Sequence, residues 1–80
     1  MTTRERVLEL LVRVCETDEV RDDANLRLWD LGILDSLRTV ELILALFAEL
    51  GVEVSPAEFD REAWATPGRV VAEVERRLGA

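Results

Sequence analysis

An aspartate and a serine lie next to each other inside an otherwise apolar stretch, LGILDSL, at residues 31–37. A serine in such a position can cap a helix, act as a nucleophile, or serve as the attachment point of another group. Capping is the commonest of the three roles, because Asp35 and Ser36 are both good N-cap residues. The remaining sequence has to decide among these roles.

Nucleophilic catalysis is the weakest of the three interpretations. A serine nucleophile needs a positioned base, and the chain contains neither histidine nor lysine, since all ten basic residues are arginine. An exposed Asp35 is a weak base for a hydroxyl. The acidic residues between positions 16 and 23 fit no calcium loop, so no metal site is expected either. We therefore expect no catalytic residues and no enzyme activity of the chain's own.

The composition is that of one small globular domain spanning residues 1–80, with 49% hydrophobic and 34% charged residues. The net charge of −7 disfavours nucleic acid and anionic membranes and favours a basic protein partner. No apolar run approaches the roughly 20 residues of a membrane span, so direct membrane insertion is not expected. One cysteine and no signal peptide predict a cytoplasmic protein, which we expect to be a monomer.

Two long segments, residues 4–16 and 36–50, show the apolar spacing of amphipathic helices. Thr2 and Glu5 form a capping box at the start of the first, and Gly51 is a stop signal after the second. The apolar stripe of the first helix comprises Val7, Leu8, Leu11, Val14 and Cys15. The position of the cysteine in this stripe predicts a buried, inert thiol.

A last helix is predicted to begin at Thr66-Pro67, and Ser55–Glu58 predicts a short one. Residues 17–35 lack a helical period and predict a long loop anchored by its apolar residues, with a short helical turn inside it as the alternative. Trp29 and Trp64 are predicted to anchor loops. The apolar stripe of the last helix comprises Val70, Val71, Val74 and Leu78. The sequence thus predicts an all-α four-helix bundle, with three main helices, one short helix and a long first loop.

The helix at 36–50 carries more apolar surface than a small bundle can cover. Its apolar arc spans roughly 220°, about twice the minimum core-facing stripe. The arc comprises Leu37, Val40, Leu42, Ile43, Leu44, Leu46, Phe47 and Leu50. We expect part of this arc to be exposed for a partner. Phe47 lies at its margin, and the pattern leaves open whether it belongs to the core or to a partner contact.

The residues around the serine resemble the phosphopantetheine attachment site of acyl and peptidyl carrier proteins: Trp29-Asp30-Leu31, Gly32-Ile33-Leu34-Asp35-Ser36-Leu37 and Thr39-Val40-Glu41-Leu42. A second stretch resembles the D-alanyl carrier proteins: Phe59-Asp60-Arg61-Glu62, Trp64 and Thr66-Pro67. The resemblance extends over the whole chain and implies the acyl-carrier type of bundle. The second stretch favours an aminoacyl carrier over a fatty-acid carrier.

The resemblance implies a role for each matching residue. Ser36 would carry 4'-phosphopantetheine covalently, and Asp35 would help to orient the modifying synthase and its metal. The surface read by partner enzymes would comprise Leu37, Val40, Glu41 and Leu44. Those partners would be a phosphopantetheinyl transferase, an adenylating amino acid ligase, and a downstream acyltransferase or synthase.

The function implied is that of a stand-alone aminoacyl carrier, which holds an amino acid as a thioester. The amino acid would be D-alanine for teichoic acids, or a building block for a natural product. The alternatives are an acyl carrier of polyketide or fatty-acid synthesis and an unmodified helical interaction module. An acyl cavity would be lined by Leu42, Ile43, Leu46 and Val71. An amino acid should instead stay outside near Leu37, because burying an unpaired ammonium is costly.

Overall fold

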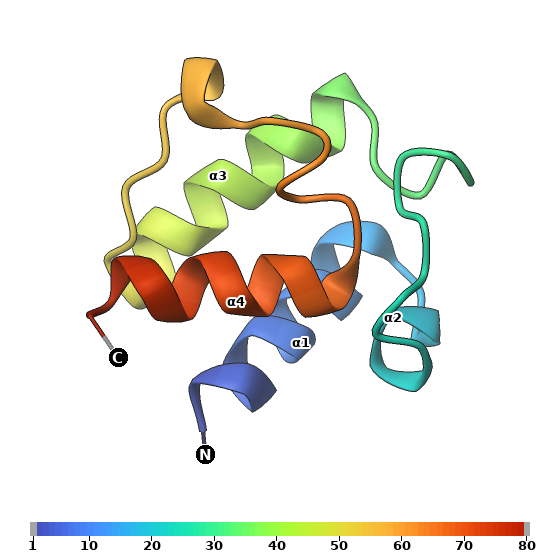
Figure 1. Cartoon of the computed structure of the whole chain (residues 1–80), viewed down its shortest axis with the longest axis horizontal. Helices are drawn as coiled ribbons and strands as arrows, with labels where there is room; N and C mark the ends of the chain where they lie inside the picture. The colour runs from blue at the N-terminus through green and yellow to red at the C-terminus, as the bar shows by residue number, and fades with distance from the viewer. Residues whose placement is uncertain (1, 80) are drawn as a thin grey trace.

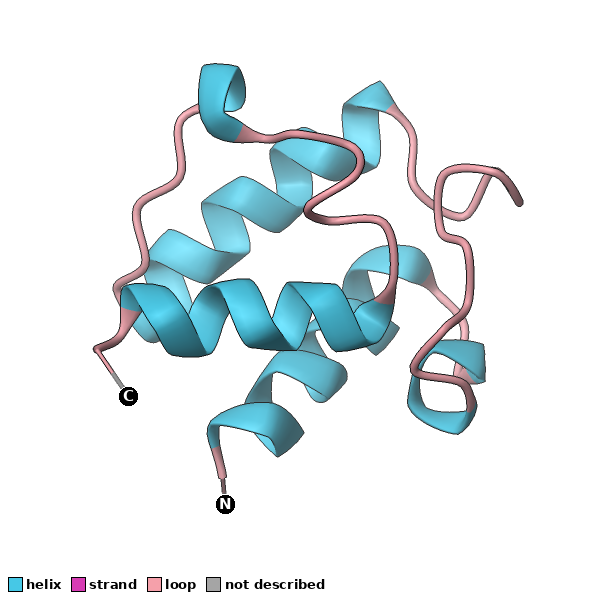
Figure 2. Cartoon of the chain, in the orientation of Figure 1, coloured by secondary structure: helices cyan, strands magenta, loops and turns pink. Residues whose placement is uncertain are grey.

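The computed structural model describes residues 2–79 and is all-helical over that range, with no strand (Figures 1 and 2). Its elements are α1 (Thr3–Cys15), α2 (Glu19–Asp22), α3 (Ser36–Leu50), a single 3-10 turn (Pro56–Glu58) and α4 (Pro67–Arg77). The three main helices and the long first loop are confirmed. The short helix predicted at 55–58 is this 3-10 turn, and the alternative prediction of a helical turn within 17–35 is α2.

Local capping chemistry places the ends of the main helices. The Thr2 hydroxyl accepts the Glu5 backbone N–H at 3.2 Å before α1. At its other end α1 stops at Cys15, one residue before the predicted end, because Glu16 takes a left-handed φ of 57°. Gly51 ends α3 with a φ of 68°, a conformation that glycine adopts without strain. These ends agree with the sequence signals to within a residue.

The core lies where α1 packs against α3 and α4. Fully buried side chains from α1, α3 and α4 fill it, and they include Val7, Leu10, Leu11, Leu42, Leu46, Val70 and Val74. Cys15 is buried as predicted, whereas Leu8 is only half-buried. The prediction that Leu78 belongs to the core stripe is wrong: α4 ends at Arg77, and Leu78 is 43% exposed just beyond it.

The long first loop is anchored along one side of the bundle, as predicted (Figure 1). The Leu28 N–H donates to the carbonyl of Ala65, just before α4, at 3.0 Å. The N–H of Gly68, in the first turn of α4, donates to the Ala24 carbonyl, also at 3.0 Å. Leu28 is fully buried. The loop that leads to α3 is therefore held in a fixed path.

Three aromatic side chains pack together where the long first loop meets the segment before α4. Phe59 stacks on the fully buried Trp64 with ring centroids 4.6 Å apart, and it meets Trp29 edge-on at 6.0 Å. Both tryptophans therefore anchor loops, as predicted. None of the helices within residues 2–79 is long and apolar enough to cross a membrane.

Candidate functional site

The start of α3 is capped by Asp35 rather than by Ser36. The Asp35 carboxylate accepts the backbone N–H of Arg38 at 2.9 Å. The Asp35 carbonyl accepts the Thr39 hydroxyl at 2.7 Å and the Thr39 N–H at 2.9 Å. Ser36 is the first residue of the helix and is exposed. Because the neighbouring aspartate satisfies the cap, the serine hydroxyl is left available for chemistry.

Backbone hydrogen bonds hold the end of the loop that leads to Ser36. Gly32 has a φ of 72°, which favours glycine, and its N–H bonds to the Trp29 carbonyl at 3.1 Å. The N–H groups of Ile33 and Leu34 both bond to the Leu28 carbonyl at 2.9 Å, and Leu34 is buried. A buried residue one position before the cap thus fixes where the exposed serine lies.

Arg38 connects this helix start to the end of α1. Its guanidinium donates to the Cys15 carbonyl at 2.5 Å and to the Glu16 carboxylate at 2.8 Å. Helical periodicity places Arg38 in the polar sector of α3, but its side chain is only 30% exposed. Periodicity cannot reveal this contact, because its partners lie 22 and 23 residues earlier in the chain.

A straight line of exposed apolar side chains runs down α3 from the serine. The four residues of this α3 strip, with their exposed fractions, are Leu37 (70%), Val40 (50%), Leu44 (63%) and Phe47 (55%). Leu42 and Leu46, on the other face of the helix, are fully buried. The predicted partial exposure of the apolar arc is confirmed. Phe47, whose place was left open, is exposed and does not belong to the core.

The strip ends at an open groove of about 330 Å³ between α3 and the segment that follows it. The groove is lined by Ile43, Leu44, Phe47, Glu53, Val54 and Ser55. Of the four residues suggested to line an acyl cavity, Leu42, Leu46 and Val71 are buried in the core, with at most 3% exposure. Ile43 alone among the four lines this outer groove. Glu41 is exposed on α3, outside the strip.

Burial raises the pKa of the Cys15 thiol to about 11, and the nearby Arg38 guanidinium opposes that rise. The thiolate is therefore scarce near neutral pH, and Cys15 is a poor nucleophile. In the described part of the chain, no three His, Cys, Asp or Glu side chains are grouped so that they could hold a metal ion.

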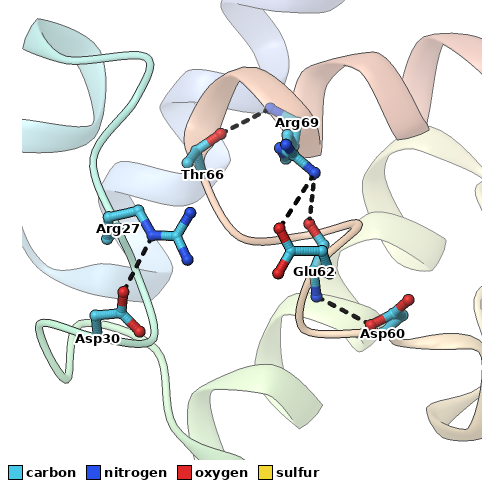
Figure 3. A network of polar contacts seen from close by, with 6 residues as sticks. All are labelled: Arg27, Asp30, Asp60, Glu62, Thr66 and Arg69. Atoms are coloured by element: carbon cyan, nitrogen blue, oxygen red, sulfur yellow. Dashed lines mark hydrogen bonds and ion pairs between the residues drawn. The ribbon is translucent and has the colours of Figure 1, made fainter.

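A network of polar contacts lies in two separate parts, one in the loop before α3 and one in the segment before α4 and its first turn (Figure 3). Arg27 pairs with Asp30 at 3.1 Å in the first loop, and Arg69 donates to the Glu62 carbonyl at 3.0 Å in the second. Between them lies a pocket of about 160 Å³, whose lining includes Arg61 and Trp29. The Arg61 guanidinium lies over the Trp29 ring, with its carbon 4.9 Å from the ring centroid. Because these cations already have partners, we interpret the network as structural.

Comparisons with known proteins match nearly the whole chain. A family model described as the phosphopantetheine attachment site matches residues 5–74. The D-alanyl carrier protein of Listeria innocua serovar 6a is 44% identical over 75 residues, which cover 94% of this chain and 96% of the relative. The D-alanyl carrier proteins of Staphylococcus saprophyticus and Enterococcus faecalis are 43% and 40% identical over the same shares.

Proposed function

The chain belongs to the phosphopantetheine attachment family, together with the D-alanyl carrier proteins, and from that premise we propose that Ser36 is its attachment residue. Membership of the family implies a covalently bound 4'-phosphopantetheine and a carrier role. The observation that carries the assignment to Ser36 is its place at the exposed start of α3, where Asp35 does the capping. We further propose that residues 1–80 act as a single carrier domain.

The surroundings of Ser36 suit a phosphodiester. A helix N-terminus presents backbone N–H groups and a partial positive charge, both of which favour a phosphate. The Asp35 carboxylate already accepts one of these N–H groups, so it holds the turn that presents the serine. In addition, we propose that Asp35 helps to orient the modifying synthase and its metal.

When bound, phosphopantetheine supplies a terminal thiol on a flexible arm, to which an amino acid is joined as a thioester. The chain's own residues hold this arm at a fixed point and present it. We propose that a separate ligase activates the amino acid, because the chain has no histidine or lysine and its one thiol is buried. The protein is then a carrier without catalysis of its own.

We propose that partner enzymes read the first part of the α3 strip, Leu37, Val40 and Leu44, together with Glu41. These partners are a phosphopantetheinyl transferase, an adenylating ligase, and an acyltransferase or synthase. Three apolar side chains with half or more of their surface exposed are unusual on a small soluble domain. They suit apolar partner contacts, and the neighbouring acid suits a basic rim.

The proposed cargo is D-alanine, and this proposal is supported by the names of the relatives. Leu42 and Leu46 are fully buried on the core face of α3, and an unpaired ammonium would be costly to bury among them. The amino acid should therefore remain outside the core, near Leu37.

An acyl chain is the second candidate cargo, and one observation favours it. The outer groove at Ile43, Phe47 and Val54 is apolar and lies along the helix that bears Ser36. Amide-proton shifts on loading distinguish the two cargoes. Shifts confined to the residues around Ser36 support an amino acid, whereas strong shifts at Ile43 and Val54 support an acyl chain.

The test of the attachment site uses intact mass. The apo-protein is incubated with a phosphopantetheinyl transferase and coenzyme A, and then with D-alanine, ATP and a D-alanine-activating ligase. We expect a gain of one phosphopantetheine, followed by a gain of one alanine. Ser36→Ala should gain neither, and Ser55→Ala, which removes the only other serine, should behave as the wild type. An unmodified wild-type protein, or a modified Ser36→Ala variant, would favour an unmodified interaction module or another attachment residue.

A further inference from the structure

Arg38 engages two different parts of the molecule at once. Its backbone N–H bonds to the Asp35 carboxylate, the cap directly before Ser36. Its guanidinium bonds to Cys15 and Glu16, at the end of α1. One residue thus joins the first turn of the serine-bearing helix to the end of α1.

The bond to Cys15 differs from an ordinary surface ion pair. The last carbonyls of a helix lack partners within the helix, and Cys15 is the final residue of α1. The chain turns away at Glu16 with a φ of 57°, and Cys15 is only 3% exposed. A cation at a helix C-terminus is favourable, and the loss of a donor to a partly buried carbonyl is costly. These contacts therefore favour the observed position of the Arg38 side chain.

The far end of α3 provides a matched comparison. There Arg13 pairs with the Glu49 carboxylate at 2.5 Å, and Arg6 donates to the Glu49 carbonyl at 3.1 Å. The Arg13 side chain is 60% exposed, so water can replace its contact. Arginines tie α3 to α1 at both ends, but only the tie at Arg38 is partly buried and close to Ser36.

We propose that Arg38 is a positioning residue for the modification of Ser36, an inference that rests on the attachment proposed above. In that transfer the Ser36 oxygen bonds to the coenzyme A phosphorus that bears the pantetheine. The bond from this phosphorus to the nucleotide portion breaks, 3',5'-ADP leaves, and a base on the transferase takes the serine proton. Such displacements depend on alignment, and a misplacement of about 1 Å can cost about a hundredfold in rate.

Arg38 secures that alignment because it prevents the first turn of α3 from fraying or pivoting away from α1. Val40 and Leu44 of the proposed docking surface lie beyond this turn, so docking of the transferase should survive the loss of the Arg38 side chain. The loss should therefore appear in kcat rather than in KM. A purely structural role would lower the melting temperature and leave kcat unchanged at temperatures well below it.

The experiment measures phosphopantetheine transfer to the full chain, with coenzyme A, at a temperature where every variant is folded. We expect Arg38→Ala to lower kcat about tenfold or more, with KM within about twofold of wild type. Arg38→Lys, which retains a donor, should recover part of the rate. The control Arg13→Ala should remain within about twofold of wild type in both constants.

Hydrogen exchange at the amides of the first turn of α3 provides the second readout, and it should accelerate in Arg38→Ala but not in Arg13→Ala. Unchanged transfer by Arg38→Ala overturns the inference and leaves the attachment at Ser36 standing. Slow transfer with unchanged exchange also overturns it, because Arg38 would then contact the transferase directly. Failure of the wild type to be modified overturns the proposed function itself.

Discussion

The starts of α3 and α4 use the same capping chemistry. Each follows an extended N-cap residue, Asp35 or Thr66, with φ values of −140° and −135°. Each cap accepts the backbone N–H of an arginine three residues later, Arg38 at 2.9 Å and Arg69 at 3.2 Å. Both guanidiniums then donate to a backbone carbonyl elsewhere in the chain.

The two helix starts differ in what covers them. Thr66 and Pro67 are buried against the long first loop, whereas Asp35 and Ser36 are exposed. Proline offers neither a hydroxyl nor an N–H at the first position of α4, where serine offers both at α3. A capped helix start that other segments cover therefore serves packing, whereas one that is exposed to solvent is available for chemistry. Four sets of substitutions test how the covered and the exposed parts of the molecule differ, from the largest expected effect to the smallest.

Trp64→Ala should destabilise the protein most. Trp64 lies two residues before the α4 cap, is fully buried and stacks on Phe59. Its truncation should cost about 3–5 kcal/mol, a large share of the roughly 5–15 kcal/mol that stabilises a small domain. Ile33 holds the equivalent place before the α3 cap and is half-buried, so Ile33→Ala should cost clearly less. Urea unfolding followed by far-ultraviolet circular dichroism measures both, and equal losses would mean that the two helix starts are equally packed.

The same contrast applies along α3 itself. Leu42 is fully buried and Leu44 is 63% exposed, two positions further on. Leu42→Ala should cost about 2–5 kcal/mol, whereas Leu44→Ala and Val40→Ala should each change stability by under about 0.5 kcal/mol. The two exposed substitutions should nevertheless slow loading with the amino acid. Thermal melts beside loading rates check this, and a large fall in melting temperature for Leu44→Ala would remove it from the docking surface.

Removal of the caps should have a smaller effect on stability. Thr66→Ala and Asp35→Ala each delete a side-chain acceptor, which typically costs about 0.5–2 kcal/mol. Thr66→Ala should lie near the upper end, because Thr66 is buried and its bond to the Arg69 N–H is part-buried, whereas the bond at Asp35 is exposed. Asp35→Ala should lie near the lower end but slow the modification of Ser36. Denaturation midpoints and transfer rates together measure the pair; a reversed order of stability losses would contradict the assigned difference in burial.

The last effect is absent at neutral pH and concerns the buried thiol at the end of α1. Burial raises the pKa of Cys15 from 9.0 to about 11, so the folded state holds the thiol proton more tightly than the unfolded state. The resulting stabilisation is complete below pH 9 and is lost as pH rises from about 9 to about 11. Unfolding midpoints of the wild type should fall over this window relative to those of Cys15→Ala. A parallel pH dependence of the two proteins would show that the thiol is not shielded.

Local signals explain why much of the fold was predictable. Apolar spacing and capping residues act within a few positions, and they located α1, α3 and α4 to within a residue or two. The exposure of the α3 strip was predictable because the apolar arc of that helix is wider than a small bundle can cover. The four-residue α2 was only an alternative, because so short a helix has no period to detect.

Contacts between distant segments were not predictable from these signals. The bond from Arg38 to Cys15 and the stacking of Phe59 on Trp64 depend on how loops cross over the bundle. Leu78 was misplaced because its spacing continues the stripe although the helix has already ended. For the site, the residue pattern suggests Ser36 as the attachment residue, while only the structure reveals how its turn is held.

The aromatic corner has an optical consequence. The chain has two tryptophans and no tyrosine, and Trp29 and Trp64 both contact Phe59. Nearly all of the intrinsic fluorescence therefore arises where the long first loop meets the segment before α4, at the covered helix start. Emission should respond sharply when those loops separate during unfolding. It should stay constant when Ser36 is modified or loaded. Tryptophan fluorescence therefore reports on the covered start of α4 and not on the exposed start of α3.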